Sequence, residues 1–504
     1  MKKSPSVVSS SLSAIAKTAR RIVHCLPFAV ALGAFAWDSP TIAPGRALIF
    51  PDDSQIAAVS NVTRCIHAAV KDKDPVLKKD RPWESKGCHV YGSVYRQADG
   101  SYRMWYNDWS RALVADSKDG KTWVKPYLTV YASEQFPSNN MCRDAWGHCI
   151  SLIDDRFEKN PERRYKLIGC SYKFEKDWSI NKEITGYYGS CSADGLVFKG
   201  SKRLLYGWDT ISMAQHPETG EIFVYHKICT PWYAGREDVR RVVFLSRTRD
   251  FVNFTKPEIA LAPDEADDMS FTENQNQRMD IYTHTAFPYA GGFIGFPTMF
   301  RIDLRNPSGH GQTSDQGFCD VQLATSRDGV KWMRTPGRKT VITYGEPGNW
   351  DCGGIWGVAG GELVNIGKET MVYYYGLDNA HGRKLRKEQT LIATGRAVWR
   401  RWGFASMGCS GSGTFTTRPV KLGTGDVRLN LRPVFDPFKR GGASVTVTVL
   451  SENGKRVLAV SEPVGGDDTL AKLSWKGGRK VPVGKPVRLR FDVRAAAVYA
   501  VECM

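Results

Sequence analysis

From about residue 44 onward, apolar and polar residues alternate over short runs instead of following a helical period. Stretches such as 111–115, 165–171 and 320–325 have the length and the Val-, Ile-, Leu- and Tyr-rich texture of strands. Turn-forming Gly, Asp and Asn residues separate them, and the 48 glycines and 25 prolines fit many short connections. The pattern predicts an all-β fold.

A recurring phrase, Ser-x-Asp-Gly-x-x-aromatic, follows several of these strands. It begins at Ser117, Ser192 and Ser326, and a looser copy begins at Ser246. Asp-Gly supplies the positive φ of a tight turn, and the aromatic residue can pack back on the sheet. The phrase therefore predicts a β-hairpin, and we expect its aspartates to be structural.

A second repeated feature is an acidic residue, usually after a large side chain, that precedes a Gly- and Ser-dotted strand. It recurs every 60 to 71 residues, and each unit has room for about four strands. Five such units predict a five-bladed β-propeller over residues 44–408. If each acid opens the innermost strand of its blade, five carboxylates surround one central funnel. The five acids are Glu84, Asp144, Asp209, Asp280 and Asp351.

Two end segments differ from the repeats. Residues 412–504 alternate apolar and polar positions between Asn-Gly and Gly-Gly turns, which predicts a C-terminal β-sandwich. Residues 1–36 combine a basic start with a short apolar stretch ending in Ala-Phe-Ala, which favours a cleaved signal peptide over a short membrane anchor. We therefore expect a secreted or periplasmic protein with no membrane span after signal removal.

Charge and cysteines narrow the choice of partner only slightly. The formal net charge of +18 falls to +13 without residues 1–36, which suits a polyanionic carbohydrate better than nucleic acid in an exported protein. A diffuse positive surface that aids solubility is the alternative. Eleven cysteines after the signal allow a disulfide but define no framework. Cys142 and Cys149, with Asp144 and His148 between them, lack paired metal-ligand spacing, so a structural role is favoured.

The blade openings, the hairpins, and segments such as 75–84, 104–106, 320–329 and 487–491 resemble the five-bladed propeller glycosidases of families 32, 43 and 68. The chain resembles more closely the proteins called "glycosyl hydrolase family 32, N-terminal-like", over about residues 44–504. The Asn-Asp-Pro-Asn and Arg-Asp-Pro motifs of invertases are absent, and the one Glu-Cys pair, at Glu502, lies near the C-terminus. Cleavage of fructans is therefore not implied.

The resemblance implies that a base or nucleophile, a pKa-setting acid and a general acid come from the first three blades. Carried over by position, these are Glu84, Asp144 and Asp209, although Glu in the first place and Asp in the third reverse the usual residue types. Glycoside hydrolysis uses two carboxyl groups, and crowded acids raise one another's pKa. The structural alternative is that each acid caps a turn.

The sequence therefore predicts a glycoside hydrolase that acts on an oligosaccharide or polysaccharide, with no cofactor and no metal. A non-catalytic carbohydrate-binding propeller is the alternative from another class. A sialidase is disfavoured because its repeat has one more residue between Asp and Gly, and because six blades cannot be counted. The residues predicted to bind substrate are Arg143, His226, Arg240, Arg278, Asp280, Tyr282, His284, Trp350 and Asp351.

Overall fold

A computed structural model describes residues 39–173, 175, 181–207, 209–230, 240–268, 278–304, 315–382, 390–435 and 442–504. The predicted signal peptide, residues 1–36, lies outside the described residues. Strands make up nearly all of the regular structure, and the one described α-helix is the single turn α1 (Glu265–Asp268). The all-β prediction is confirmed.

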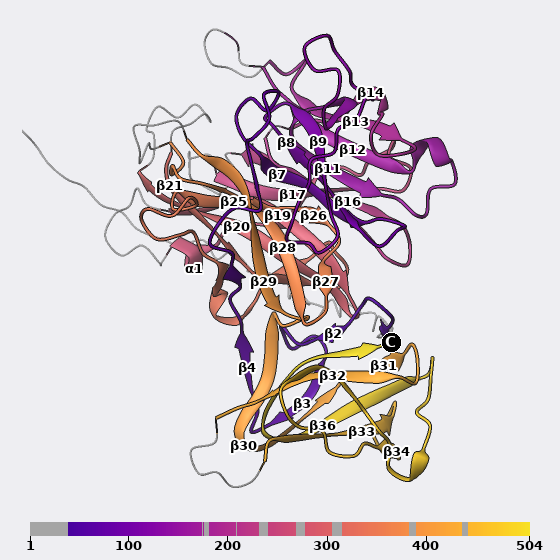
Figure 1. Cartoon of the computed structure of the whole chain (residues 1–504). Helices are drawn as coiled ribbons and strands as arrows, with labels where there is room; N and C mark the ends of the chain where they lie inside the picture. Colours follow the sequence, from indigo (N-terminus) through magenta and orange to yellow (C-terminus); the bar gives the residue numbers. More distant parts are fainter. Residues whose placement is uncertain are drawn as a thin grey trace, which may run out of the picture. The chain divides into compact units, whose positions relative to one another are not determined.

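Five antiparallel sheets follow one another along the chain and form the predicted five-bladed propeller (Figure 1). Each blade begins at its innermost strand and continues outward. Blade one has β7 (His89–Arg96), β8 (Tyr102–Asn107), β9 (Arg111–Ser117) and β10 (Met141–Trp146). Blade two has β11 (His148–Asp154), β12 (Tyr165–Ser171), β13 (Gly186–Ser192) and β14 (Lys199–Leu205). Blade three has β15 (Ile211–Gln215), β16 (Ile222–Thr230), β17 (Arg240–Thr248) and β18 (Glu258–Leu261).

Blades four and five are less regular. Blade four has β19 (Arg278–Tyr289), β20 (Gly292–Leu304), β21 (Gln316–Gln322), β22 (Ala324–Ser326), β23 (Trp332–Arg334) and β24 (Thr340–Ile342). Blade five has β25 (Gly354–Val358), β27 (Val364–Ile366), β28 (Glu369–Leu377) and β29 (Ile392–Arg400). Its outer edge is completed by two strands from the other end of the chain, β5 (Val70–Lys71) and β6 (Leu77–Lys78).

Serine and threonine side chains on the inner strands link each blade to its neighbour. Every one of these bonds joins a hydroxyl group to the main chain of the adjacent inner strand, which holds the strands around one axis. The ring is completed by β26 (Gly360–Gly361), which pairs in parallel with β7. The bonds run from Ser93 Oγ to Leu152 O (2.8 Å), from Met213 N to Ser151 Oγ (2.9 Å), from Ser212 Oγ to His284 O, and from Thr285 Oγ1 to Val358 O (2.8 Å).

The Ser-x-Asp-Gly hairpins make a second set of contacts between blades. In each hairpin the aspartate accepts hydrogen bonds from main-chain N–H groups of its own turn, as expected for a structural acid. The glycine carbonyl accepts a hydrogen bond from an aromatic residue of the preceding blade. These pairs are Gly120 with Tyr373 (2.6 Å), Gly195 with Trp105 (2.7 Å) and Gly329 with Tyr225 (2.6 Å). The Ser-x-Asp-Gly motif therefore forms the turn of a hairpin and also links its blade to the preceding blade.

The C-terminal residues form an eleven-stranded sheet with its own apolar core, which is compatible with the predicted sandwich. Four strands from the beginning of the described chain, within residues 41–66, join this sheet. Ala47, between two of these strands, also accepts a main-chain hydrogen bond from Ala290 of blade four. The N-terminal strands are β1 (Thr41–Ile42), β2 (Leu48–Ile49), β3 (Ile56–Ser60) and β4 (Thr63–Ile66). The others are β30 (Ala405–Thr417), β31 (Val420–Leu422), β32 (Val427–Pro433), β33 (Ser444–Ser451), β34 (Val457–Val460), β35 (Asp468–Lys472) and β36 (Pro486–Cys503).

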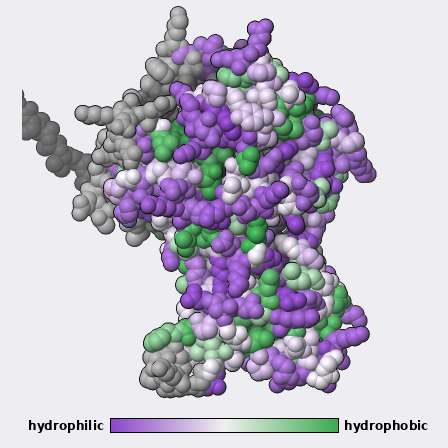
Figure 2. All heavy atoms as spheres, in the orientation of Figure 1, coloured by the Kyte–Doolittle hydropathy of each residue, from purple (hydrophilic) through white to green (hydrophobic). Residues whose placement is uncertain are grey.

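The surface that Figure 2 draws is mainly polar, and the described cysteines form no disulfide. Figure 2 shows mainly hydrophilic side chains, with apolar ones scattered among them, on the face it draws. The cysteines whose side chains are described are all free. Across the described part of the chain, helices are too short and too polar for any of them to cross a bilayer.

Candidate active site

The inner strands start at one end of the propeller axis, and their first residues meet there. Counting three positions back from the ring-linking hydroxyl residues Ser151, Ser212 and Thr285 gives His148, Asp209 and Tyr282. These three side chains come together: Nε2 of His148 lies 3.5 Å from Oδ1 of Asp209, and Lys227 bridges Asp209 and the ring of Tyr282. We call this group, together with Cys149, the axial cluster.

Asp209 is the carboxylate of the axial cluster. It has a positive φ of 75°, which is rare for residues other than glycine and is typical of functional positions. Burial by itself would raise its pKa, but the Lys227 ammonium group and the His148 ring outweigh burial and hold the pKa well below its usual range. Its side chain is still 20% exposed. Asp209 is therefore an ionised carboxylate that a substrate can reach.

Lys227, on β16, forms an ion pair with Oδ2 of Asp209 and lies 4.5 Å from the centre of the Tyr282 ring. The side chain of Lys227 is only 5% exposed, so the pair is weakly screened by solvent. Cys149 approaches the other oxygen of Asp209, with its Sγ 3.7 Å from Oδ1. The two oxygens of this carboxylate thus face different partners.

His148 links the axial cluster to the surface. Its Nδ1 lies 3.3 Å from the carbonyl oxygen of Trp109, and the two rings are 4.7 Å apart. Trp109 is 39% exposed and has a φ of 116°, a strained conformation for a large side chain. Tyr172, also exposed, lies 5.7 Å from the His148 ring. Exposed aromatic faces of this kind suit stacking on sugar rings.

Buried aromatic residues surround the cluster on its inner side. The centre of the His89 ring lies 6.4 Å from that of His148 and 5.1 Å from that of Tyr375. His89 is completely buried. Burial, and then the charge of His148, lower the pKa of His89 well below its usual value, so His89 is neutral. Burial raises the pKa of Tyr91 and Tyr282, which therefore remain protonated hydrogen-bond donors.

Of the three acids predicted to be catalytic, the structure brings only Asp209 to the axis. Glu84 is fully buried between blades one and five, where Lys125 forms an ion pair with it and Tyr106 donates a hydrogen bond of 2.7 Å. Its other hydrogen-bond donors are Asp80 N, Arg81 N and the Cys88 thiol. This carboxylate has the contacts of a structural group, and none of them is shared with Asp209.

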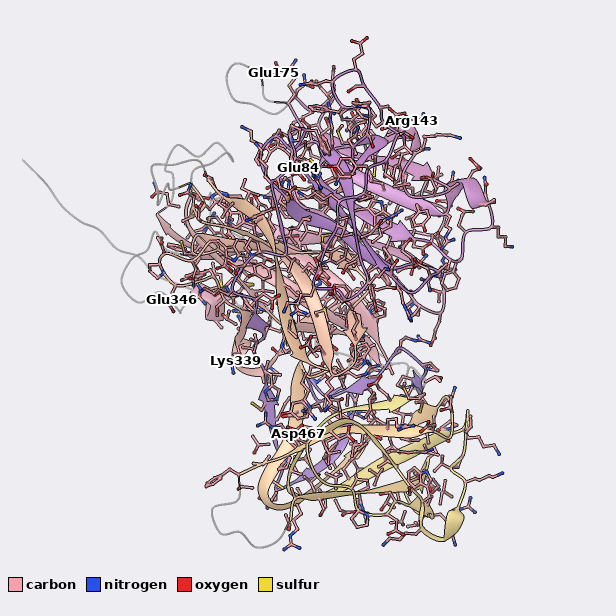
Figure 3. All side chains as sticks on the ribbon, viewed as in Figure 1. Glu84, Arg143, Glu175, Lys339, Glu346 and Asp467 are labelled. Carbon is pink, nitrogen blue, oxygen red and sulfur yellow. The ribbon has the colours of Figure 1, made fainter. Side chains whose placement is uncertain are left out.

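Asp144 and Arg143 lie on the outermost strand of blade one and not at an inner-strand start. Both are exposed, and the pairing of β10 with β9 is irregular between Met141 and Trp146. Figure 3 labels Arg143 at the periphery, away from Glu84. The inner strand of blade two begins four residues after Asp144, at His148. Asp144 therefore lies on the last strand of blade one and not on the inner strand of blade two.

The residues predicted to bind substrate divide in the same way. Tyr282 belongs to the axial cluster. Asp280 is fully buried and forms ion pairs with Arg240, Arg241 and Arg278. This network continues to Asp268 through Arg240 and to Asp315 through Arg241.

The remaining predicted contacts are internal. His226 lies 3.2 Å from Ser246 Oγ, and burial lowers its pKa to about 4. His284 packs 4.3 Å from Trp332, and burial lowers its pKa to about 3. Asp351 pairs with Lys71 of the outer strand β5.

Trp350 stacks on Tyr374 with an interplanar angle of 13°. None of these contacts involves a residue of the axial cluster.

His148, Lys227 and Cys149 were not among the predicted site residues, and the sequence favoured a structural role for the segment that holds His148 and Cys149. A signal for His148 was present, because the ring-linking Ser151 and Ser212 occupy equivalent positions of two inner strands. Aligning the blades on these hydroxyl residues places His148 and Asp209 at the same position. No comparable signal marks Lys227, which lies in a second strand.

Comparisons with known proteins give structural resemblance at low identity. No family model matches the chain, and no curated protein sequence matches it. An N-acetylgalactosamine deacetylase from F. plautii, solved with blood group B trisaccharide, is 14% identical, covers 72% of this chain and 94% of its own, and has a TM-score of 0.39. A β-fructofuranosidase from Schwanniomyces occidentalis, complexed with fructosyl-erythritol, is 9% identical, covers 87% and 99%, and has a TM-score of 0.37. A putative glycosidase from Bacteroides thetaiotaomicron is 14% identical, covers 69% and 96%, and has a TM-score of 0.35.

Proposed function

We propose that the chain is a hydrolase that cleaves glycosidic bonds of an oligosaccharide or polysaccharide at the axial cluster. One observation carries this proposal: an ionised, solvent-accessible carboxylate, Asp209, lies where the inner strands meet, between a lysine and a histidine. Exposed rings of Trp109 and Tyr172 beside it suit a sugar substrate.

The low pKa of Asp209 suits a base or nucleophile and not a general acid, because a general acid must hold its proton near neutral pH. This reverses the role that the resemblance implies for this position. His148 lies beside it, with its Nε2 3.5 Å from Oδ1 of Asp209. In this proposal the ionised Asp209 carboxylate orients the attacking group at the axial cluster.

The test is a screen for new reducing ends with uronate-rich and sulfated polysaccharides as substrates, which also probes the positive charge of the chain. Asp209→Asn preserves the shape of the side chain and removes its charge, so we expect product formation to fall at least 100-fold, as for loss of an acid–base group. Asp144→Asn, on the exposed outer strand, is the matched control and should retain activity. Undiminished turnover by Asp209→Asn contradicts the proposal.

A carbohydrate-binding propeller without catalysis is the second candidate. It is favoured by the finding that Glu84 and Asp144 do not join Asp209, because the usual glycosidase mechanism requires two carboxyl groups. A binder would raise its melting temperature with a glycan of the panel and release no reducing ends.

A further inference from the structure

Three side chains of the axial cluster have the chemistry and spacing of metal ligands. His148 Nε2 and Cys149 Sγ lie 3.5 and 3.7 Å from Asp209 Oδ1, and the three ligand atoms all lie within 4.8 Å of one another. A tetrahedral zinc ion with bonds of about 2.0–2.3 Å separates nitrogen from oxygen by about 3.4 Å and sulfur from oxygen by about 3.6 Å. The two distances to Oδ1 of Asp209 match those expected around zinc, and His148 Nε2 and Cys149 Sγ lie within 4.8 Å of each other.

Neighbouring contacts leave the correct ligand atoms available. The Nδ1 atom of His148 lies 3.3 Å from the Trp109 carbonyl oxygen, to which it can donate, and this leaves Nε2 as the unprotonated ligand. Lys227 occupies Oδ2 of Asp209, so Oδ1 is the oxygen that faces His148 and Cys149. Partners that orient a histidine and a carboxylate in this manner are typical of metal sites.

His89 provides an independent indication. It is completely buried, and neither of its ring nitrogens has a hydrogen-bond partner among the described residues. Buried polar groups nearly always have such a partner, so an unpaired imidazole beside His148 requires an explanation. The His89 ring centre lies 6.4 Å from that of His148, so a metal-bound water molecule at the axial cluster is a candidate for the missing partner.

We propose that His148, Cys149 and Asp209 bind one Zn²⁺ ion and leave its fourth position open to water. The mixed nitrogen, sulfur and oxygen donor set selects zinc over calcium or magnesium, which prefer oxygen ligands. The thiol of Cys149 loses its proton when the metal binds. Three protein ligands and one open position are the arrangement of catalytic zinc sites, and the partial exposure of Asp209 and His148 gives the ion a path of entry.

The experiment measures metal content and not turnover, so the zinc site and the glycosidase proposal can fail separately. Full-length protein is treated with a chelator, dialysed against ZnCl₂ and then against metal-free buffer, and analysed by mass spectrometry for zinc. We expect one zinc per chain for the wild type, and less than one tenth of that for His148→Ala and Cys149→Ser. Cys142→Ser, a buried cysteine outside the cluster, is the matched control and should keep one zinc.

Cobalt gives a second readout. Co²⁺ bound in the same site should show a near-ultraviolet thiolate-to-cobalt band that Cys149→Ser loses and Cys142→Ser keeps. Circular dichroism of the variants at 20 °C verifies that they are folded. A wild-type chain that retains no zinc, or variants that bind as much as the wild type, overturns the proposal.

Discussion

The Glu84–Lys125 ion pair allows a quantitative test of the structural role that its burial indicates. The Glu84 side chain is 0% exposed and that of Lys125 is 4% exposed, and their charged atoms lie 2.7 Å apart. Lys125→Met keeps the apolar part of the side chain and leaves the carboxylate buried without its cation. Breaking a buried pair from one side costs about 3–5 kcal/mol. The propeller runs from His89 to Arg400, about 300 residues, and with an unfolding entropy of about 2.1 cal/mol/K per residue the loss corresponds to roughly 5–8 °C in melting temperature.

The assay is differential scanning calorimetry of Lys125→Met, Glu84→Gln and the double variant. Because the two groups interact directly, the double variant should lose less than the sum of the single losses, by about 0.5–3 kcal/mol. Lys121→Met, on the exposed part of the same connection, is the control and should melt like the wild type. A Lys125→Met variant that melts within about 1 °C of the wild type would refute the reasoning, since that is under about 1 kcal/mol. So would a Glu84→Gln variant that is fully folded and yet has lost all turnover.

Two further predictions concern the blades. Gly195→Ala should lower the melting temperature more than Gly200→Ala. The two glycines have similar φ values, 73° and 72°, but an added Cβ would lie 2.8 Å from Trp105 only at Gly195. Equal losses of melting temperature in calorimetry would show that the contact between blades contributes nothing. The buried His284, whose pKa of about 3 is depressed below the unfolded value of about 6.5, binds a proton on unfolding, so its contribution to stability is present above pH 6.5 and is lost as the pH falls toward 3. Replacing it in His284→Leu should therefore reduce the slope of stability against pH in that window by about 1.4 kcal/mol per pH unit, and an unchanged slope in urea unfolding at several pH values would contradict the assigned burial.

The propeller could be predicted because its signals are local. A turn such as Asp119-Gly120 is encoded within a few residues, and the same phrase repeats at the spacing of a blade. Strand alternation identified the sheet-forming segments for the same reason. The pairing of β2 with β36 was not predicted, because it joins residues more than four hundred positions apart and depends on which edges remain free.

The site was predicted only in part, because the charged groups that surround a carboxylate in the fold come from distant parts of the sequence. Nothing near Glu84 in the sequence reveals that Lys125, forty-one residues away, neutralises it inside the fold. Asp144 occurs at the spacing of the repeat, but it lies on the irregularly paired outer strand β10 of blade one. The inner strand of blade two begins four residues later, at His148. Asp209 lies two residues before its inner strand, which begins at Ile211, and its side chain reaches the axis.

The use of strands from both ends of the chain constrains the order in which this protein can fold during synthesis. β5 and β6 pair with β29, more than three hundred residues later, so the ribosome must complete most of the polypeptide before blade five can gain its outer edge. Contacts of such long sequence separation form slowly, and until they form the incomplete ring presents unpaired strands to other molecules. Truncated or stalled chains should therefore depend on chaperones, and a permuted chain that joins 66–78 directly after 400 should mature faster than the natural order.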